Sequence, residues 1–252
     1  MDQPRGERHE QRGLPSEQAG TDAVAPESLS QRLADLARDM QRQDNAADVM
    51  QVIVTAAVAM VPGVEEASIS LTRGRRRIVS AAATGDRPRR FDDAQAETGQ
   101  GPCVDAMYDH ETVRVDDLPS ERRWPELARR APQLGLTSML CFQLFVDGDD
   151  LGALNLLARR PGAFTDESEW IGLPFAGHAA VALAQAEKVN HLGTALASRD
   201  VIGQAKGILM ERYKMTSDQA FALLVRASME SNRKLLELAE HLTDTGVLTT
   251  ER

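Results

Sequence analysis

The C-terminal quarter of the chain contains the run Arg199-Asp-Val-Ile-Gly-Gln-Ala-Lys-Gly-Ile-Leu-Met210. Placed on a helix at about 100° per residue, the run separates into two faces. One face is apolar and is formed by Val201, Ile202, Ala205, Ile208 and Leu209. A second face combines cations, glycines and a methionine and is formed by Arg199, Gly203, Lys206, Gly207 and Met210. Lys214 also lies on this face if the helix extends that far.

The second face is unusual because it places two glycines inside a helix. Each costs about 1 kcal/mol relative to alanine, so a compensating contact is expected at Gly203 and Gly207. Close approach of a polyanion is one such contact, and the neighbouring Arg199 and Lys206 favour it. Tight packing of another helix is the alternative, with the cations in solvent. The helix geometry alone leaves both interpretations open.

Two further helices are predicted after this run. Thr216 and Gln219 have the spacing of a capping box, and Ser231 or Asn232 is expected to cap the last helix. Apolar residues recur at helical spacing in both segments, namely Ala220, Phe221, Leu224, Ala227, Leu235, Leu238, Ala239 and Leu242. Gly246 is expected to end the last helix. Three short helices bury little surface alone, so the unit is expected to lean on a second copy or on the helix that enters it.

These residues resemble an ANTAR domain, the RNA-binding output module of bacterial transcription antiterminators. The resemblance covers about residues 190–247 without a gap and includes the run Ala195–Met210. Matching positions continue beyond that run at Ser217, Ala220, Phe221, Leu224, Ser228, Asn232, Lys234 and Ala239. The resemblance implies a three-helix unit that binds hairpin loops in nascent leader RNA, usually as a dimer, and prevents a terminator from forming.

Nine residues form the candidate RNA-binding site under this interpretation. The cations expected to contact phosphates are Arg199, Lys206 and Lys214. The glycines expected to permit close approach are Gly203 and Gly207. The residues expected to reach loop nucleotides are Arg226, Asn232, Arg233 and Lys234.

Local charge is consistent with this site without establishing it. The whole chain has a net charge of −9, whereas residues 196–234 carry seven Lys or Arg against four Asp or Glu. By itself this pattern favours an ordinary mixed-charge helical surface. Aromatic groups are scarce in the segment. Tyr213 is a candidate for stacking on an unpaired base, whereas Phe221 lies on the apolar stripe and is expected in the core.

Composition places the chain among soluble globular proteins, with 42% hydrophobic and 27% charged residues. No apolar run approaches the roughly 20 residues of a membrane span, and the N-terminus lacks the apolar core of a signal peptide. Two cysteines do not make a disulfide framework, which fits a reducing cytoplasm. Residues 1–27 are rich in Pro, Gly, Gln, Glu and Arg and are predicted to be disordered.

The middle of the chain, residues 28–187, predicts an α+β sensor domain. Helices are expected from about Ser28, from Asp44 or Asn45 to Pro62, and from about Asp166 onward. Alternating segments predict strands at 67–71, 77–83, 112–116, 138–146 and 151–158. The pattern indicates an antiparallel sheet of five or six strands flanked by helices.

This segment resembles a GAF domain, in the form found fused to ANTAR modules in actinobacteria. The likeness spans about residues 45–187 and rests on several short motifs, among them Gly99-Gln-Gly-Pro-Cys103, Val115-Asp-Asp-Leu118, Arg123-Trp-Pro-Glu-Leu-Ala128 and Gly152-Ala-Leu-Asn-Leu156. It implies a sensor with a small-molecule ligand. GAF domains bind many unrelated ligands, so the cofactor or ligand is unknown.

Cys103 follows Gly-Pro and precedes a predicted helix, whose N-terminus would lower the pKa of the thiol. That environment makes Cys103 a candidate redox sensor, and the alternative is a small residue packed at a turn. Cys141 is expected in the core. The pairs Asp92-Asp93 and Asp116-Asp117 are interpreted as loop charges and caps, and Trp124 and Trp170 as residues packed under loops.

The sequence contains no catalytic constellation, since it lacks a Gly-rich phosphate loop, a G-x-S-x-G elbow and an H-E-x-x-H helix. No spacing of Cys and His predicts a metal site. The chain is therefore not expected to be an enzyme.

Between the two domains, apolar residues recur every three or four positions, at Val181, Ala184 or Gln185, Val189, Leu192 and Leu196. This spacing favours a short parallel coiled coil. The output unit is expected to span residues 188–248. We expect its first helix to continue from the last helix of the sensor as one unbroken helix. A signal at the sensor would then alter pairing of two copies.

The sequence as a whole predicts a cytoplasmic, signal-responsive RNA-binding regulator that acts in transcription antitermination and forms a homodimer. The alternative is a sensor or scaffold whose C-terminal bundle binds a protein partner. A helix-turn-helix DNA-binding protein ranks third, because no recognition helix is evident.

Overall fold

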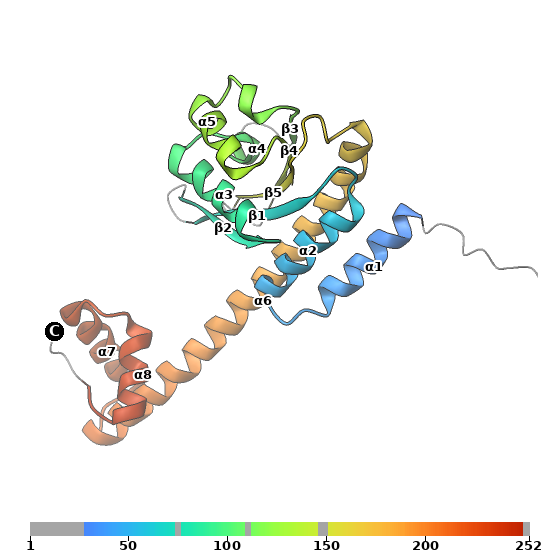
Figure 1. Ribbon diagram of the computed structural model, residues 1–252. Helices are drawn as coiled ribbons and strands as arrows, with labels where there is room; N and C mark the ends of the chain where they lie inside the picture. The colour runs from blue at the N-terminus through green and yellow to red at the C-terminus, as the bar shows by residue number, and fades with distance from the viewer. Residues whose placement is uncertain (1–27, 74–76, 109–111, 146–150, 249–252) are drawn as a thin grey trace, which may run out of the picture.

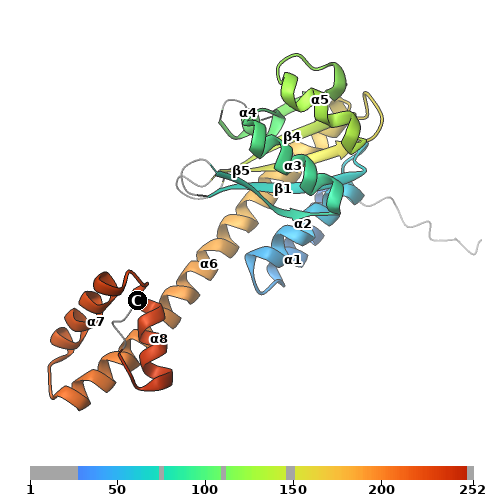
Figure 2. The same cartoon turned by 60° about the vertical axis from the view of Figure 1, so that its left-hand side comes forward.

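In the computed structural model, the structure describes residues 28–73, 77–108, 112–145 and 151–248. A sheet with helices on both faces lies at one end of a long helix, and two shorter helices pack on the other end of that helix (Figure 1, Figure 2). The predicted disorder of residues 1–27 lies outside the described residues.

The sheet has five strands, as the alternating segments predict. They are β1 Glu66–Arg73, β2 Arg77–Ala83, β3 Thr112–Val115, β4 Ser138–Phe145 and β5 Leu151–Ala158. Their order is β2-β1-β5-β4-β3, and every neighbouring pair is antiparallel. Alternation along β1 sends Ile69 to one face of the sheet and Ser68 and Ser70 to the other. The two faces therefore have different chemistry.

One face of the sheet packs against α2 Ala46–Met60 and the first part of α6, and α1 Leu29–Gln41 packs on α2 and α6. Both short helices begin at predicted caps, since Ser28 Oγ accepts from Gln31 N at 3.2 Å and Asn45 Oδ1 from Asp48 N at 3.0 Å. The fully buried side chains of this layer are apolar and include Ile53, Val54, Ile69, Leu154, Phe175 and Leu183.

The other face carries α3 Asp86–Thr98, α4 Pro102–Tyr108 and α5 Pro125–Leu134. The helix predicted beside Cys103 is confirmed as α4, whereas the sequence pattern does not predict α3 and α5. A short 3₁₀ turn, η1 Leu118–Ser120, precedes α5. The α3 segment is mostly polar and buries only a few apolar side chains such as Phe91, so its helical period is faint. Tertiary packing against the sheet decides its conformation.

The two tryptophans differ in their burial. Trp124 is buried as expected, and its Nε1 donates to Asp105 Oδ2 at 3.2 Å. Trp170 is 69% exposed on α6, so the expectation that it packs under a loop is wrong. Its position on the outer side of the helix leaves no neighbouring element to cover it.

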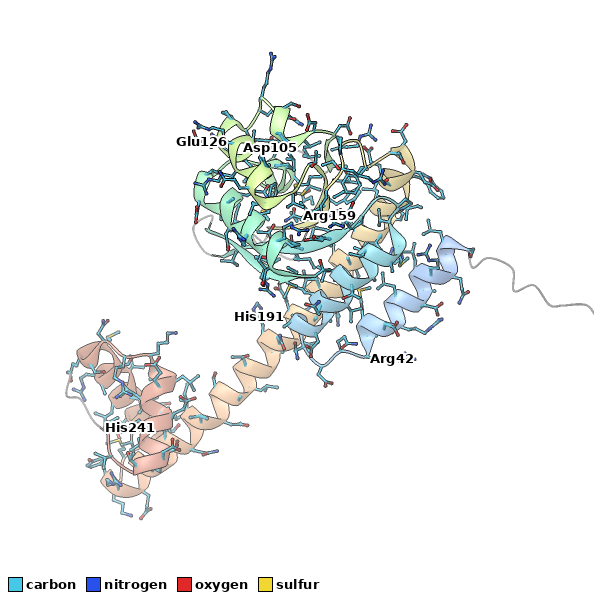
Figure 3. All side chains as sticks on the ribbon, in the orientation of Figure 1. Arg42, Asp105, Glu126, Arg159, His191 and His241 are labelled. Atoms are coloured by element: carbon cyan, nitrogen blue, oxygen red, sulfur yellow. The ribbon has the colours of Figure 1, made fainter. Side chains whose placement is uncertain are left out.

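Helix α6, Asp166–Tyr213, runs without a break from the sheet to the C-terminal helices, which confirms the predicted continuous rod. Its 48 residues span about 70 Å at the usual rise. Thr165 and Ser168 form a capping box at its start. His191 lies on the stretch of α6 between the two packed ends, and His241 lies on the C-terminal helices (Figure 3).

Four large apolar side chains on this connecting stretch are exposed. We call them the α6 seam, formed by Val181, Val189, Leu192 and Leu196. They are four of the five predicted coiled-coil positions; at the remaining position, Ala184 packs against the core of the sheet layer. Each leaves more than half of its surface in solvent, so the seam has no partner within the described chain.

The C-terminal unit consists of the end of α6 with α7 Ser217–Ser231 and α8 Leu235–Thr245. Its small core contains Ala205, Leu209, Ala220, Leu224, Ala239 and Leu242. The capping box at Thr216 is confirmed, because Thr216 N donates to Gln219 Oε1 at 2.9 Å. Gly246 ends α8 in the left-handed conformation, with φ of 72°, as expected. The unit leans on α6, which supplies part of its core.

The predicted cap of the last helix is wrong. Lys234, not Ser231 or Asn232, occupies the N-cap position of α8, and it makes no side-chain capping bond. Asn232 instead ends α7 with φ of 53°, a conformation that asparagine tolerates better than most residues. Ser231 donates to Ala227 O at 2.7 Å.

No helix within the described ranges is both long enough and apolar enough to cross a membrane.

Gly172 and Gly177 provide a stability test of the α6–sheet contact. A Cβ at Gly172 would lie 2.5 Å from two ring carbons of the buried Phe142, whereas a Cβ at Gly177 would meet nothing within 4 Å. We expect Gly172→Ala to lower the free energy of unfolding by about 1–3 kcal/mol through overpacking. Gly177→Ala, the matched control, should raise it by up to about 1 kcal/mol. Urea denaturation measures both, and equal effects would contradict this packing.

Candidate nucleic-acid interface

The run 199–210 forms the last part of α6, and its two predicted faces are confirmed. Ala205 and Leu209 are fully buried in the core of the C-terminal unit. We call Arg199, Gly203, Lys206, Gly207 and Met210 the α6 stripe. Of these, Lys206 is half-buried and the others are exposed.

The two glycines of the α6 stripe face open space. A Cβ built at Gly203 or Gly207 would meet no atom within 4 Å. Packing by another helix of this chain therefore does not explain them. Gly207 also lines an open hollow between α6 and α8, with Arg212 and Thr243 on its walls. The cost of two helical glycines is not offset by any contact in the described structure, so the surface is free for a partner.

Most cations of the C-terminal unit have no acidic partner. Within the described residues, those without a carboxylate oxygen inside 4.0 Å are Arg199, Lys206, Arg212, Arg226, Arg233 and Lys234. Arg212 donates to Gly246 O at 2.5 Å and so helps to close the end of α8. Unpaired cations on an exposed surface keep their full electrostatic attraction for phosphate.

Lys214 differs from its expected position. The helix ends at Tyr213, and Lys214 adopts the left-handed conformation with φ of 51°. Lys214 therefore does not continue the α6 stripe. Its ammonium pairs with Glu211 at 2.5 Å. The pair reduces the positive charge available to a phosphate at this point.

The remaining predicted contacts lie on a different part of the unit. Arg226 is on α7, and Asn232, Arg233 and Lys234 form the turn between α7 and α8. Ser228 Oγ donates to Arg233 O at 2.6 Å, which ties this turn to α7. Within the described residues, no side-chain hydrogen bond or ion pair joins this turn to the α6 stripe. The nine predicted residues thus do not lie on one helix face: four belong to the α6 stripe, four lie on α7 or the turn after it, and Lys214 lies at the end of α6.

Phe221 is exposed, which corrects its expected place in the core. Its neighbours Ala220 and Leu224 are fully buried, but Phe221 leaves 42% of its surface in solvent. The Lys206 ammonium lies 5.9 Å from the centre of its ring. Tyr213 is also exposed. The unit therefore presents two aromatic rings beside unpaired cations.

The sensor domain contains a buried polar cluster that the sequence pattern did not predict. Asp92, interpreted as a loop charge, lies in α3 and is 1% exposed. Its carboxylate accepts from Ser68 Oγ at 3.0 Å, from Ser80 Oγ at 2.6 Å and from Asn155 Nδ2 at 2.9 Å. Asn155 Nδ2 also reaches Ser70 Oγ at 3.0 Å. The serines at alternate positions of β1 are the sequence feature that could have predicted a polar cluster on this face.

Burial governs the ionisation of this cluster. It raises the pKa of the Asp92 carboxyl to about 6, although its hydrogen bonds act in the opposite direction. Asp92 has no cationic partner among the described residues. Its charged form is therefore disfavoured in the folded protein.

The expected lowering of the Cys103 pKa is wrong. Cys103 is the second residue of α4 and is fully buried. Burial, together with the nearby Asp92 charge, raises the pKa of its thiol to about 12. Desolvation outweighs the helix N-terminus, and the reactive thiolate on which the redox hypothesis rests is not favoured. Cys141 is buried in β4, as expected.

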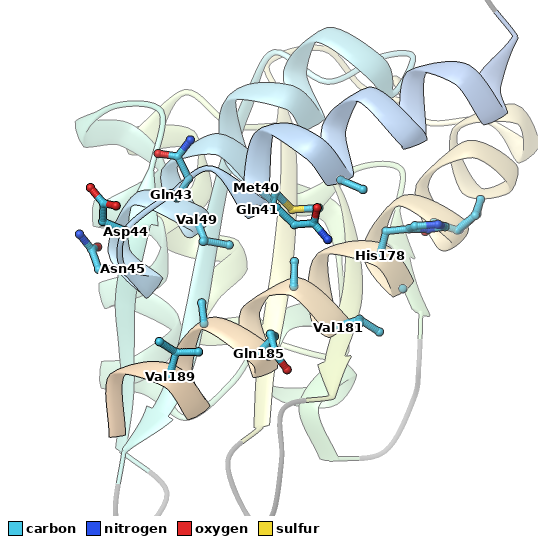
Figure 4. Close-up of a pocket in the computed structure, with 15 residues that line it drawn as sticks. Met40, Gln41, Gln43, Asp44, Asn45, Val49, His178, Val181, Gln185 and Val189 are labelled. Atoms are coloured by element: carbon cyan, nitrogen blue, oxygen red, sulfur yellow. The ribbon is translucent and has the colours of Figure 1, made fainter. Parts of the chain in front are cut away.

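No group of three or more His, Cys, Asp or Glu side chains within the described ranges is arranged to hold a metal ion. A mostly apolar hollow lies between α1 and α6 (Figure 4). It is an open groove of about 870 Å³, with apolar walls that include Met40, Val49, Val181 and Val189. His178 and Asp44 stand at its edges. Two seam residues thus line the groove.

Comparison with protein families assigns both parts of the chain. The model of the GAF domain matches residues 43–184, more than half of the chain. The chain belongs to the GAF domain family. The model of the ANTAR domain matches residues 190–242, which include the α6 stripe. A GAF domain joined to an ANTAR domain indicates a signal-responsive regulator with an RNA-binding output.

Solved structures similar to the GAF domain show the same fold. Free methionine-R-sulfoxide reductase from Neisseria meningitidis, in complex with its substrate, has a TM-score of 0.52 at 16% identity, over 70% of this chain and 98% of that one. The phycoerythrobilin-bound GAF domain of a cyanobacterial phytochrome has a TM-score of 0.51 at 12% identity, over 66% and 100%.

The GAF domain of a phosphoenolpyruvate-protein phosphotransferase from Coxiella burnetii has a TM-score of 0.50 at 17% identity, over 65% and 96%. At such identities the likeness concerns the fold alone. None of the curated proteins matches the chain.

Asp92 predicts an unusual pH dependence of stability. Its folded pKa of about 6 exceeds the ordinary value of 3.8, so between these pH values the folded protein binds more protons than the unfolded one. This contribution is fully present below the unfolded pKa and is lost as the pH rises through 6, a change of about 3 kcal/mol. Asp92→Asn should remove this pH-dependent loss of stability, because asparagine does not ionise.

Urea denaturation between pH 4 and 7.5 tests this. The free energy of unfolding of wild type minus that of Asp92→Asn should fall as the pH rises. The matched control is Asp93→Asn, since Asp93 is the exposed neighbour of Asp92. Identical pH profiles for both variants would show that the Asp92 pKa is ordinary.

Proposed function

We propose that the protein is a signal-responsive transcription antiterminator whose ANTAR domain binds hairpin loops in leader RNA. The observation that carries the proposal is the open α6 stripe, with its unpaired cations, inside the segment matched by the ANTAR family. A polyanion approaching Gly203 and Gly207 would meet Arg199 and Lys206 directly. The resemblance to the fused GAF–ANTAR form of actinobacteria supports this assignment.

In this proposal the protein acts in the cytoplasm and is a regulator, not an enzyme. The GAF domain receives the signal, a small molecule or a protein, and helix α6 carries the effect to the ANTAR domain. A helix packed into cores at both ends links them mechanically, because a change in its tilt at the sheet moves its other end.

The RNA-binding function is tested with purified full-length protein and cellular RNA. Ultraviolet crosslinking followed by recovery of bound RNA should enrich transcripts that form hairpins. Such a hairpin, placed before a terminator, should then show increased readthrough by RNA polymerase when the protein is added. Recovery of a protein partner without any RNA would favour the scaffold alternative.

We also propose that the protein is a homodimer joined along the α6 seam. Covering an apolar side chain of this size stabilises a complex by about 1.5–3 kcal/mol, and the seam presents four in a row. In a parallel pair the seam would end near Leu196. Beyond it, Arg199 of each copy would face its equivalent, and like charges at close range repel. The stripe is thereby left open to RNA.

Lys206→Ala tests the phosphate contact. Loss of one phosphate-neutralising cation should weaken hairpin binding and reduce the slope of log affinity against log salt by about one. Fluorescence anisotropy at several salt concentrations measures both. The matched control is Lys188→Ala, because Lys188 is exposed on the same helix outside the ANTAR domain. An unchanged affinity and slope would remove Lys206 from the contact set.

Leu192→Glu combined with Leu196→Glu tests the dimer. Charges at two exposed seam positions should convert a micromolar dimer into a monomer without altering the fold, as measured by analytical ultracentrifugation and circular dichroism. The same two substitutions at Ala195 and Ser198, exposed or half-exposed residues outside the seam, serve as the control. Wild-type protein that stays monomeric with and without RNA would exclude the seam as an interface.

A further inference from the structure

Phe221 is a large aromatic side chain of the ANTAR domain that lies outside the core. It lies in the first half of α7, where Ala220 and Leu224 already supply the buried contacts. A phenylalanine with 42% of its surface in water gives up much of the free energy that burial would provide. The surface therefore presents an aromatic ring that packing does not require.

The ring is paired with a cation from another helix. The Lys206 ammonium, on α6, lies 5.9 Å from the ring centre, within the range of a cation–π contact. Lys206 has no carboxylate partner within 4.0 Å in the described chain. Helices α6 and α7 thus hold a free positive charge and an exposed ring side by side.

This pairing matches the chemistry of an unpaired nucleotide. The flat base stacks on an aromatic ring, and the phosphate, one sugar away, meets a cation. A paired base cannot use the site, because its faces are covered by its neighbours in the helix. A base in a hairpin loop can be turned out to reach it.

We infer that Phe221 and Lys206 form a stacking site for one unpaired base of the RNA loop. The inference rests on the proposed RNA-binding function and specifies what part of the RNA is recognised there. Phe221 supplies the stacking surface, and Lys206 holds both the ring and the adjacent phosphate. The site selects loops over duplexes and has little preference among bases, since every base has a flat face.

The test uses full-length protein and a fluorescent RNA hairpin selected by binding from a library with a fixed stem and a randomised loop. Phe221→Leu keeps an apolar side chain but removes the ring, and it should weaken binding about 5- to 100-fold. Because no charge is lost, the salt slope should stay unchanged, in contrast to Lys206→Ala. Phe221→Trp should retain or increase affinity.

Met229→Leu is the matched control, because Met229 is 77% exposed on the same helix and is not part of the proposed site. Thermal unfolding verifies that each variant is folded. Abasic substitutions at each loop position identify the stacked base, since at one position the abasic RNA should bind wild type and Phe221→Leu equally.

The outcomes separate the inference from the function on which it rests. If wild type binds the hairpin and Phe221→Leu binds it equally well, the stacking site is wrong and the RNA-binding function stands. If every abasic RNA retains the difference between the two proteins, Phe221 acts on the fold of the domain and not on a base. If wild type binds no hairpin, both are overturned.

Discussion

The structure depends on helix α6, which packs into a hydrophobic core at each end and is exposed to solvent between them. Phe175 and Leu183 anchor the first part of α6 in the sheet layer, while Ala205 and Leu209 anchor its last part in the ANTAR core. Helices of this kind owe most of their stability to packing, which the connecting stretch lacks within one copy. That stretch is where a second chain would contribute most, and where a signal must pass.

Chemistry changes along the exposed side of the same helix. The α6 seam, which ends at Leu196, is apolar, whereas the α6 stripe, which begins at Arg199, includes the cations Arg199 and Lys206. One helix can thus present a protein interface and a phosphate-binding surface in succession. The boundary is set by charge, because the backbone continues without a break.

The two faces of the sheet in the GAF domain are buried by different helices and carry different side chains. The face toward α2 and α6 is apolar and holds the rod in place. The face toward α3 and α4 contains Asp92 and its serine partners, a cluster that an apolar core would not need. The amide nitrogen Nε2 of Gln95, a hydrogen-bond donor in the same helix as Asp92, is buried without an acceptor among the described residues. Both faces contain an apolar core, and the buried polar cluster lies on the face toward α3 and α4.

Local sequence rules located the strands, the caps at Ser28 and Asn45, and the end of α8. Each of these features depends on residues that are close together in the chain. Hydrophobic periods of two and 3.6 residues therefore predict the strands and helices directly. The same rules separated the buried Ala205 from the exposed Gly203. The helices of the output module and the two faces of the run 199–210 were therefore accessible from sequence, whereas the pairing of its cations was not.

Only the tertiary structure placed the residues whose environment comes from distant segments. Asp92 is buried because β1, β2 and β5 surround a polar helix, and Cys103 has a raised pKa for the same reason. Phe221 fits the apolar stripe of α7 by spacing, yet it lies outside the core because Ala220 and Leu224 already fill the narrow contact with α6 and α8. Sequence alone determined which residues alternate or share a helix face, whereas the neighbouring elements decided which of those faces were covered, because burial depends on what packs against a face and not on its period.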